Sequence, residues 1–434
     1  MIGNFLYRLF IYSYSIGVRL AAFGSPKARQ WIAGRKNFPV LPDNAESTIW
    51  MHCASLGEFE QGRPLLETIK NQFPTYKIVL TFFSPSGYEV MKGYKGADYI
   101  FYLPMDSKTN AKKMIAAINP CLVLWVKYEF WFFYLTQLKK KNIPVLMVSG
   151  LFRQSQPFFK WYGGIWRKML QSFTHIFVQN EASKKLLVIA GIKDNVGISG
   201  DTRFDRVIAI ALQFEPMCVI EKFCGNSNVI VAGSTWEDDE AELVHYVRNH
   251  PEIKFIIAPH EVDAANLKDV KQQFAGAVFY SELQGQEQTV DGQNPTIEKV
   301  TTNPTYSFPV NNHVLIIDNI GMLSKLYHYA HITYIGGGFG EDGIHNVLEP
   351  AVYGKPVIYG PVYEKFAEAV ELVDCGAGIT INNALELENV FNELWADTAL
   401  LHAKGEAAKK YVYSKAGATQ KVMAYIQEKR LLIN

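Results

Sequence analysis

The sequence of 434 residues has few cysteines and none of the spacings on which common metal sites depend. Its five cysteines are Cys53, Cys121, Cys218, Cys224 and Cys375, and no two of them form a C-x-x-C pair. An odd, scattered set in a long chain is typical of reduced thiols inside the cell, not of a disulfide framework. A zinc-type spacing, an H-E-x-x-H motif and an acidic Ca²⁺ loop are also missing, so we expect a protein that works without a metal.

The chain also has no large excess of charge of either sign. Its formal net charge is +1, which gives no global electrostatic argument for nucleic-acid binding. Hydrophobic residues make up 48% of the chain, which is ordinary for a folded protein, and this length suggests two or three domains.

Acidic residues are absent from the first 42 positions, which carry Arg8, Arg19, Lys27, Arg29, Arg35 and Lys36. The apolar run Leu9–Val18 is too short for a confident membrane span, and no small-x-small cleavage site follows it. Aromatic residues mixed with arginines suit a segment that lies in the headgroup region of an anionic membrane. We therefore expect residues 1–40 to be membrane-associated. The alternative is an amphipathic helix that packs on the protein itself.

From about residue 48, short apolar segments alternate with helical ones, which is typical of a parallel sheet covered on both faces. We expect strands at 49–53, 77–83, 99–103, 122–126, 145–148 and 175–178, and a second set at 229–232, 255–258, 314–317, 332–335 and 356–359. The sequence therefore predicts two Rossmann-like, doubly wound α/β domains, 41–215 and 216–434, that face each other across a cleft. The polar stretch 281–312 is expected to be an exposed insertion.

The first candidate site segment, His52–Glu58, follows a predicted strand and opens a predicted helix. Its small residues allow a ligand to approach the backbone, and a helix N-terminus favours anions. Glu58 would lie in the first helical turn, where the helix dipole also stabilises a carboxylate. From spacing alone, a capping role for Glu58 is favoured.

The glycine run Gly336–Gly343 follows another predicted strand and leads into a helix expected to begin near Asn346. Turns of this form can hold phosphate on backbone N–H groups. Glu349, one turn into that helix, is suited to accept both hydroxyls of a ribose. The alternative is a tight turn with a capping acid, but the clustering of glycines with His345, Asn346 and Glu349 favours function. The pattern differs from G-x-G-x-x-G, which makes a dinucleotide enzyme less favoured.

Other segments that follow strands are weaker candidates. Ser234, in Gly233–Thr235, can contact a phosphate or cap the next helix, and capping is favoured. Pro259–His260, Gly321–Met322 and Arg203, near the predicted domain junction, are each more often structural when taken alone.

Together these segments resemble the Kdo transferases of lipopolysaccharide synthesis, which transfer 3-deoxy-D-manno-octulosonic acid (Kdo). The resemblance runs through most of the chain. Its most specific match is His345–Glu349, similar to the family's H-N-P-L-E type motif, and the next is His52–Glu58, similar to H-x-x-S-x-G-E. Further matches in order and spacing are Ser84–Gly87, Tyr102–Asp106, Arg203–Asp205 and Gly233–Thr235.

The resemblance implies an inverting GT-B glycosyltransferase that moves Kdo from CMP-Kdo onto a lipid A precursor, a tetraacyldisaccharide. It implies no metal and no other cofactor, and a location at the cytoplasmic face of a bacterial inner membrane. By position it implies that Glu58 is the general base and that Arg203, usually a lysine in the family, stabilises the transition state. Donor contacts to the CMP moiety are implied for Pro259, His260, Ile320, Gly321, Met322, Asn346, Val347, Leu348 and Glu349.

Two segments depart from the family pattern. Leu124–Trp131 occupies the place of a motif with two glutamates, in which Glu129 matches the second and Lys127 stands at the first, a transition-state stabiliser. We expect Lys127 to act in the site and to pair with an anion, either the donor's carboxylate or Glu129, because a lone buried ammonium is costly. Ser149–Leu151 lacks an arginine usual at that point, with Arg153 close by.

Two other functions remain open at this stage. One is a GT-B lipid glycosyltransferase that uses a UDP-sugar. The other is a membrane-bound nucleotide-sugar sensor without turnover, which Lys127 favours and the retained Glu58 disfavours. The expected partners are a CMP-activated sugar, a lipid A precursor and an anionic membrane surface, and nucleic acid is not among them.

Overall fold

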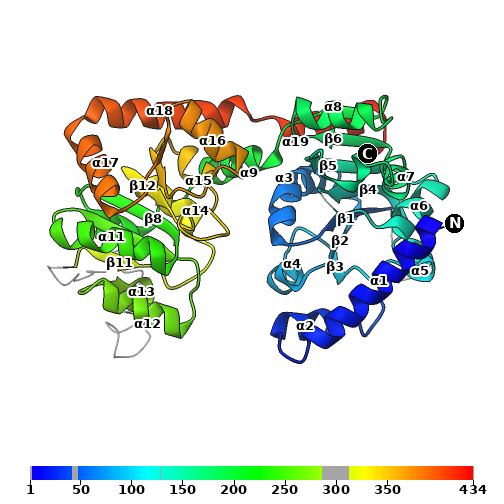
Figure 1. Ribbon diagram of the computed structural model, residues 1–434, viewed down its shortest axis with the longest axis horizontal. Coiled ribbons are helices and arrows are strands. Elements are labelled where there is room, and N and C mark those ends of the chain that lie inside the picture. Colours follow the sequence, from blue (N-terminus) through cyan, green and yellow to red (C-terminus); the bar gives the residue numbers. More distant parts are fainter. Residues whose placement is uncertain (1, 42–46, 128, 286–311, 434) are drawn as a thin grey trace, which may run out of the picture. The chain divides into compact units, whose positions relative to one another are not determined.

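The computed structural model describes residues 2–41, 47–127, 129–285 and 312–433. It divides into two compact units, Met1–Arg206 with Lys415–Asn434, and Val207–Ser414 (Figure 1). Each unit is built on a seven-stranded sheet whose described strand pairs are parallel. These two sheets confirm the expected fold class of two doubly wound α/β domains.

The sheet of the first unit has the strand order β3-β2-β1-β4-β5-β6-β7. Its strands are β1 (Thr48–Cys53), β2 (Lys77–Phe82), β3 (Tyr99–Tyr102), β4 (Pro120–Val126), β5 (Val145–Gly150), β6 (His175–Val178) and β7 (Val196–Ile198). The helices are α1 (Ile2–Ala21), α2 (Pro26–Ala33), α3 (Leu56–Gln72), α4 (Pro85–Met91), α5 (Lys108–Ile118), α6 (Phe132–Lys140), η1 (Pro157–Phe159), α7 (Gly164–Leu170), α8 (Glu181–Ile189) and α19 (Ala418–Glu428), and α9 (Thr202–Leu212) begins in this unit.

The sheet of the second unit has the order β10-β11-β9-β8-β12-β13-β14. Its strands are β8 (Val229–Thr235), β9 (Lys254–Pro259), β10 (Val278–Phe279), β11 (Val314–Ile316), β12 (Ile332–Ile335), β13 (Val357–Tyr359) and β14 (Gly378–Thr380). The helices are α10 (Cys218–Cys224), α11 (Glu237–Asn249), α12 (Ala264–Gln273), α13 (Tyr280–Gly285), α14 (Leu323–Leu326), η2 (Tyr327–Tyr329), α15 (Leu348–Ala351), α16 (Ala367–Asp374), α17 (Ala384–Ala396) and α18 (Thr398–Ser414).

Both faces of the first sheet are buried, which explains why its strands are apolar without alternation. Ile49 and Met51 of β1 belong to one apolar cluster, and Trp50 between them belongs to the cluster on the opposite face. All six residues of β1 are buried. Because successive side chains point to opposite faces, a strand covered on both sides must be apolar throughout.

The three strands that the sequence did not indicate are β7, β10 and β14. Each has only two or three residues, and β7, β10 and β14 all lie at sheet edges. Runs this short carry no readable period. Of the insertion expected at 281–312, residues 281–285 belong to α13, and 286–311 lie outside the described residues.

The C-terminal helix differs from the expected domain boundaries, which assigned 216–434 to the second domain. In the structure, Lys415–Asn434 belongs to the first unit, and Figure 1 shows α19, in red, beside its sheet. Val422, Met423 and Ile426 are buried in the same cluster as Ile49. An amphipathic pattern shows that a helix has an apolar face, but not which sheet that face covers.

Helix α1 packs on the first unit through a narrow stripe. Tyr7 and Ile11 are buried, and the Tyr7 hydroxyl donates to Asp106 Oδ2 at 2.6 Å and accepts from the Phe132 N–H at 3.1 Å. The rest of the helix and the turn after it expose large apolar side chains, namely Phe5, Leu6, Leu9, Phe10, Tyr12, Leu20 and Phe23. Among the described residues, none of the helices combines the length and apolarity that a membrane crossing requires.

Candidate active site and nucleotide-binding site

Glu58 is the third residue of α3 and lies beyond the carboxyl end of β1. The helix sits close to the sheet because residue 62 is glycine: a Cβ there would lie 2.9 Å from Met51 Sδ and Val126 Cγ2. The Glu58 carboxylate accepts a hydrogen bond from the Ser55 hydroxyl and is partly exposed. In the described part of the chain, no N–H of the first turn is capped by Glu58 or Ser55. These contacts include no capping hydrogen bond from Glu58, although its carboxylate lies in the first turn, where the helix dipole favours it.

A second carboxylate, Glu129, lies after β4 and is held in place by a buried histidine and a half-buried tryptophan. Its Oε2 lies 2.8 Å from Nε2 of His52, which is fully buried, and accepts from Trp131 Nε1 at 2.8 Å. On the other side of the imidazole, His52 Nδ1 lies 2.9 Å from the Thr81 hydroxyl. His52, the first residue of the motif at the end of β1, therefore orients Glu129, a link between two segments that sequence spacing did not show.

Glu58 and Glu129 both raise the pKa of one thiol, that of Cys53 at the end of β1. The pKa of Cys53 is raised well above its usual value, first by burial and then by the negative charges of Glu58 and Glu129. Cys53 is therefore a neutral packing residue, and its surroundings show that the two carboxylates flank the same strand end.

Lys127 comes directly after β4, as the sequence predicted. Its backbone has φ 61°, a left-handed conformation that is uncommon for a residue other than glycine, and its N–H donates to Val148 O at 3.0 Å. Its side chain is partly exposed. A strained φ at the end of a strand needs support from neighbouring structure and is frequent at functional sites.

Arg203 lies at the start of α9, where a carboxylate holds its guanidinium. Nε and Nη2 of Arg203 lie 2.9 Å and 2.8 Å from Asp201 Oδ2. The preceding residue, Thr202, is bound to the Ser149 hydroxyl at 2.9 Å and donates to Gln61 O at 2.5 Å. These contacts join the end of β5, the second turn of α3 and the start of α9, so Arg203 belongs to the same edge of the first sheet as Glu58. Arg153 is exposed and lies in the turn after β5.

In the second unit, close packing of the backbone accounts for the glycines that follow β12. A Cβ on Gly336 would overlap the backbone of Ser234 and Thr235, and one on Gly338 would lie 2.5 Å from the Gly360 nitrogen. The Gly337 N–H, at φ 90°, donates to Asp239 at 2.7 Å. These glycines therefore let the ends of β8, β12 and β13 approach one another, and the Gly337 N–H is not available to a phosphate.

Asp239 of α11 is a buried residue that sequence reasoning did not single out. Its carboxylate also accepts from the Tyr334 hydroxyl at 2.7 Å and from the Trp236 N–H at 3.0 Å. Burial raises its pKa, and these three hydrogen bonds act in the opposite direction. In the sequence, Asp239 is one of four acidic residues at the start of a helix. Such residues are also expected simply because the helix dipole favours negative charge at that end.

Three aromatic rings that follow β8, β9 and β12 form a stack. The ring of His260 lies 4.6 Å from that of Trp236 and 4.3 Å from that of His345, measured between centroids. Trp236 Nε1 donates to His345 Nε2 at 3.0 Å. Burial, followed by the charge of His260, lowers the pKa of His345 to about 4. His345 is therefore neutral near pH 7, with its hydrogen on Nδ1. The sequence did not indicate Trp236 as a site residue.

The motif residues after His345 lie beside this stack. Asn346 Nδ2 donates to Glu349 Oε1 at 3.0 Å, and Asn346 Oδ1 accepts from the Leu348 N–H at 3.2 Å. Helix α15 spans only Leu348–Ala351, so Glu349 lies in its first turn. The sequence had placed Glu349 one turn further into the helix. Val347, the N-cap residue, and Leu348 are buried, so their contribution to a ligand site is through the backbone.

The loop after β11 reaches the same strand ends. Ile320 and Gly321 are exposed, and Met322 is the N-cap residue of α14. A Cβ on Gly233 would lie 2.8 Å from Leu323 Cδ1 and would overlap the Tyr327 hydroxyl, so α14 and η2 lie against the end of β8. The negative charge of Glu349 contributes to the raised pKa of Tyr327, after burial, which places Glu349 in this neighbourhood.

One expectation for this unit is wrong. Ser234, favoured as a helix cap, has φ 55° and lies within β8, whereas the N-cap residue of α11 is Trp236. The backbone turns sharply at Ser234, and the helix starts two residues later than the capping interpretation required. Pro259 ends β9, and the N–H of His260 donates to Thr235 O at 2.9 Å.

Each unit thus collects its candidate residues at the carboxyl edge of its own parallel sheet, where α/β proteins bind ligands. The first unit offers carboxylates, suited to remove a proton. The second offers a stacked aromatic surface, a neutral histidine and a carboxylate next to an amide, suited to a nucleoside and its phosphate. Over the described residues, no group of three or more His, Cys, Asp or Glu side chains is arranged to hold a metal ion.

Comparison with known proteins shows which sequences and folds this chain resembles. Residues 27–206 match the family model described as 3-deoxy-D-manno-octulosonic-acid transferase (kdotransferase). The 3-deoxy-D-manno-octulosonic acid transferase of Aquifex aeolicus is 26% identical over 81% of this chain and 87% of its own length. That of Haemophilus influenzae is 24% identical over 94% of this chain and 93% of its own length. A bifunctional glycosyltransferase/methyltransferase of Fusobacterium nucleatum is 26% identical over 83% of this chain, which spans only 55% of that protein.

Solved structures show the fold at lower identity. The MnaA–UDP structure from S. aureus has a TM-score of 0.57 at 14% identity and covers 89% of this chain and 98% of its own. MurG of Acinetobacter baumannii has a TM-score of 0.51 at 12% identity and covers 88% of this chain and 100% of its own. The chain thus has the GT-B fold, carries the domain of the 3-deoxy-D-manno-octulosonic-acid transferase family at 27–206, and is similar to proteins of that name over most of its length.

Proposed function

We propose that this protein transfers Kdo from CMP-Kdo onto a lipid A precursor, with inversion at the anomeric carbon and without a metal. The observation that carries the proposal is the position of Glu58, a partly exposed carboxylate beyond the end of β1 that caps no N–H of the residues the structure describes. A carboxylate placed in this way is accessible to an acceptor hydroxyl. The relatives named as Kdo transferases support the identity of the sugar.

In the proposed reaction, Glu58 accepts the proton of the acceptor hydroxyl as its oxygen attacks the anomeric carbon of Kdo. The bond between that carbon and the phosphate oxygen breaks, and CMP leaves with the electron pair. In-line attack gives inversion in a single step and requires no sugar bound to the protein. Glu129, oriented by His52, and Lys127 supply charge near the reacting sugar from the end of β4.

The second unit would hold the CMP moiety. The exposed face of the ring stack suits the base, and Glu349 suits the ribose hydroxyls. With Nε2 of His345 occupied by Trp236, its Nδ1–H remains to donate to the phosphate. The Arg203 guanidinium, held by Asp201, would stabilise developing negative charge from the first unit.

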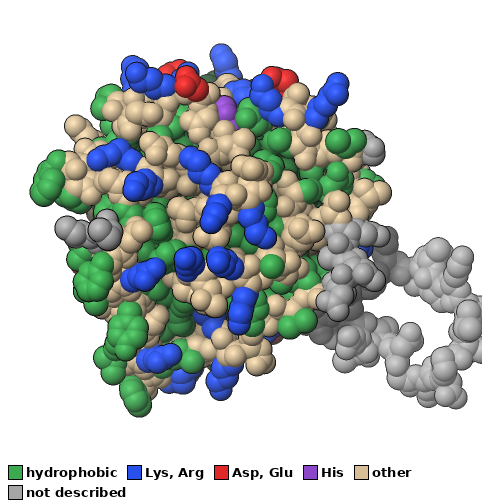
Figure 2. Space-filling view, turned by 90° about the vertical axis from the view of Figure 1, so that its right-hand side faces the viewer, with side chains coloured by type: hydrophobic (Ala, Val, Ile, Leu, Met, Phe, Trp, Pro, Cys, Tyr) green, Lys and Arg blue, Asp and Glu red, His purple; other side chains and the backbone are tan. Residues whose placement is uncertain are grey.

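The acceptor is a lipid, and the surface of the first unit supports work at the cytoplasmic face of an anionic inner membrane. Helices α1, α5, α6 and α7 contain no Asp or Glu, and all carry Lys or Arg. Figure 2 shows the same side of the molecule, where basic and hydrophobic side chains dominate and acidic ones are sparse. Exposed Phe5, Phe10 and Trp161 add aromatic groups suited to the headgroup region.

One assay tests the donor and the reaction together. The full-length protein is incubated with a tetraacyldisaccharide acceptor and either CMP-Kdo or a UDP-sugar, and release of CMP or UDP is measured. We expect CMP release that depends on the acceptor. Release of UDP instead would establish a UDP-sugar transferase, and tight CMP binding without release would establish a sensor. Either result would overturn the proposal.

A further inference from the structure

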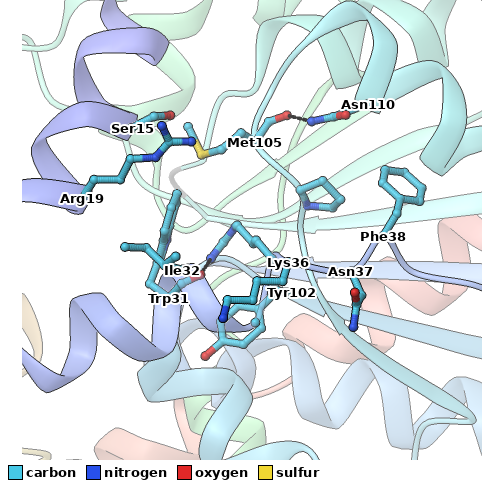
Figure 3. Close-up of a pocket in the computed structure, with 13 residues that line it drawn as sticks. Ser15, Arg19, Trp31, Ile32, Lys36, Asn37, Phe38, Tyr102, Met105 and Asn110 are labelled. Carbon is cyan, nitrogen blue, oxygen red and sulfur yellow. Dashed lines mark hydrogen bonds between the residues drawn. The ribbon is translucent and has the colours of Figure 1, made fainter. Parts of the chain in front are cut away.

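A pocket of about 390 Å³ lies in the first unit between α1, α2 and the end of β3. We call it the α1–α2 pocket. It is lined by Ser15, Arg19, Trp31, Ile32, Gly34, Arg35, Lys36, Asn37, Phe38, Tyr102, Pro104, Met105 and Asn110. Figure 3 shows Ser15 and Arg19 projecting from α1, opposite Asn110, which donates to Met105 O at 2.9 Å. Tyr102, Pro104 and Met105 belong to the family-like segment Tyr102–Asp106, but the reaction described above does not use this pocket.

Arg35 forms a rigid, positively charged wall of the pocket. Its three nitrogens donate to Leu103 O at 2.9 Å, Phe83 O at 2.6 Å and Trp31 O at 3.2 Å. Its guanidinium also lies over the Trp31 ring at 4.0 Å and the Tyr102 ring at 4.9 Å. Burial lowers its pKa to about 10, so it remains a cation at neutral pH. All three partner oxygens are carbonyls, which leave the positive charge of Arg35 without a neutralising carboxylate in direct contact.

Two further cations, Arg19 and Lys36, lie at the opening of the pocket and are exposed. Neither forms an ion pair or a side-chain hydrogen bond with any residue that the structure describes. No Asp or Glu is among the described residues that line the pocket. Three positive charges around one concavity, with no carboxylate among its lining residues, are complementary to a group with more than one negative charge.

Apolar side chains beside the opening indicate where that group comes from. Leu20, next to Arg19 on α1, is 64% exposed, and Phe23, in the turn before α2, is 88% exposed. Large apolar groups this exposed favour contact with acyl chains at a membrane surface. A phosphate that enters the pocket while attached to a lipid satisfies both the cations and these apolar side chains.

We propose that the α1–α2 pocket binds the terminal phosphate of a lipid phosphomonoester at the membrane surface. Arg35 forms the fixed wall, and Arg19 and Lys36 close on the phosphate from the opening. A monoester phosphate carries up to two negative charges and presents three oxygens, which suits a concave site with several donors. The proposal stands independently of the sugar-transfer reaction, because it concerns only how this face of the protein recognises a lipid.

The test compares the full-length protein on vesicles of two compositions with matched surface charge, one containing phosphatidic acid and the other phosphatidylglycerol. We expect binding to the phosphatidic acid vesicles to be roughly 10-fold tighter, as for one or two charge-assisted hydrogen bonds. The Arg19→Gln/Lys36→Gln variant should lose this preference and bind both vesicles equally. Arg35 is left unchanged because its removal would disturb packing.

The matched control is Lys27→Gln/Arg29→Gln, which removes the same charge from α2 at exposed positions that do not line the pocket. It should weaken binding to both vesicles and keep the preference. Equal binding of the unaltered protein to both vesicles, or loss of the preference in the control as well, would overturn the proposal. Inorganic phosphate at matched ionic strength is the third arm: if micromolar phosphate abolishes the preference for phosphatidic acid, the pocket serves free phosphate and the lipid assignment is wrong.

Discussion

Trp236 Nε1 donates a hydrogen bond to His345 Nε2 across 3.0 Å, and the imidazole of His260 stacks on both rings. Trp236 and His260 directly follow β8 and β9, and His345 lies in the loop after β12, where its N–H donates to Gly336 O at 3.1 Å. The bond from Trp236 requires that His345 be neutral, because a protonated imidazole has no acceptor nitrogen.

This relationship predicts a pH dependence of stability. Burial and His260 lower the folded pKa of His345 to about 4, below the value of about 6.5 in an unfolded chain. Below about pH 6.5 the unfolded state binds a proton that the folded state does not, so stability is lost as the pH falls toward 4. The unaltered protein should lose free energy of unfolding between pH 7.5 and pH 5. We expect this loss to be about 1 kcal/mol smaller in His345→Gln, allowing for the partial exposure of His345.

Urea unfolding of both proteins at the two pH values measures this difference. Buried Asp239 and Glu240 have raised pKa values, so their contribution has the opposite sign. It is common to both proteins and largely cancels in the comparison. Identical pH slopes for the two proteins would show that folding does not lower the pKa of His345.

Glu58→Gln should reduce turnover without affecting folding. The substitution keeps the shape of the side chain and removes its basicity, and general-base catalysis is worth about 10²–10⁴-fold. We expect turnover to fall by that factor, with CMP affinity and melting temperature nearly unchanged. The matched control is Glu60→Gln, two residues along α3, whose carboxylate pairs with Arg63 and Arg206. Near-normal turnover of the Glu58 variant would contradict the proposed mechanism.

Glu349→Gln should weaken binding of CMP. Its carboxylate is fixed by Asn346 at 3.0 Å, and the loss of a charge-assisted hydrogen bond to a ribose hydroxyl costs about 1–3 kcal/mol. Calorimetric titration with CMP measures the change. Glu393→Gln on α17, an exposed site, serves as the control. An unchanged affinity would remove Glu349 from the nucleotide site.

Lys127 should contribute to turnover more than to stability. Because its φ is 61°, Lys127→Asn removes the ammonium with a residue that tolerates the left-handed conformation, whereas Lys127→Met removes it and keeps the backbone strain of the unaltered protein. We expect both variants to lose activity by a similar factor, roughly 10-fold or more, and neither to melt earlier than the unaltered protein. Full activity of Lys127→Asn would show that the ammonium has no part in the reaction.

The exposed side of α1 should anchor the protein to anionic vesicles. Deletion of residues 1–22 would also remove the Tyr7–Asp106 hydrogen bond of 2.6 Å and expose a buried carboxyl, so point variants test this better. We expect Phe5→Ser/Leu9→Ser/Phe10→Ser to lose about 1 kcal/mol or more of vesicle binding per residue, and to keep its melting temperature. Tyr7→Phe should show the reverse: lower stability and normal binding. Equal co-sedimentation of the triple variant and the unaltered protein would contradict the anchor.

The sequence by itself determined the fold class and most of its strands, because strands covered on both faces must be apolar throughout, as in Thr48–Cys53. It also determined that Glu58, Lys127, His260 and Asn346–Glu349 follow strands, and the carboxyl ends of parallel strands share one edge. Local order along the chain was sufficient for these conclusions.

Only the tertiary structure decided which distant groups meet. The bonds from His52 to Glu129, from Trp236 to His345 and from Asp239 to Gly337 join residues far apart in sequence, and no local pattern encodes such pairs. The same holds for α19, whose apolar face is evident from its sequence but whose place on the first sheet is not. Side-chain pairing and helix docking depend on the packing of whole layers, so they are properties of the folded chain.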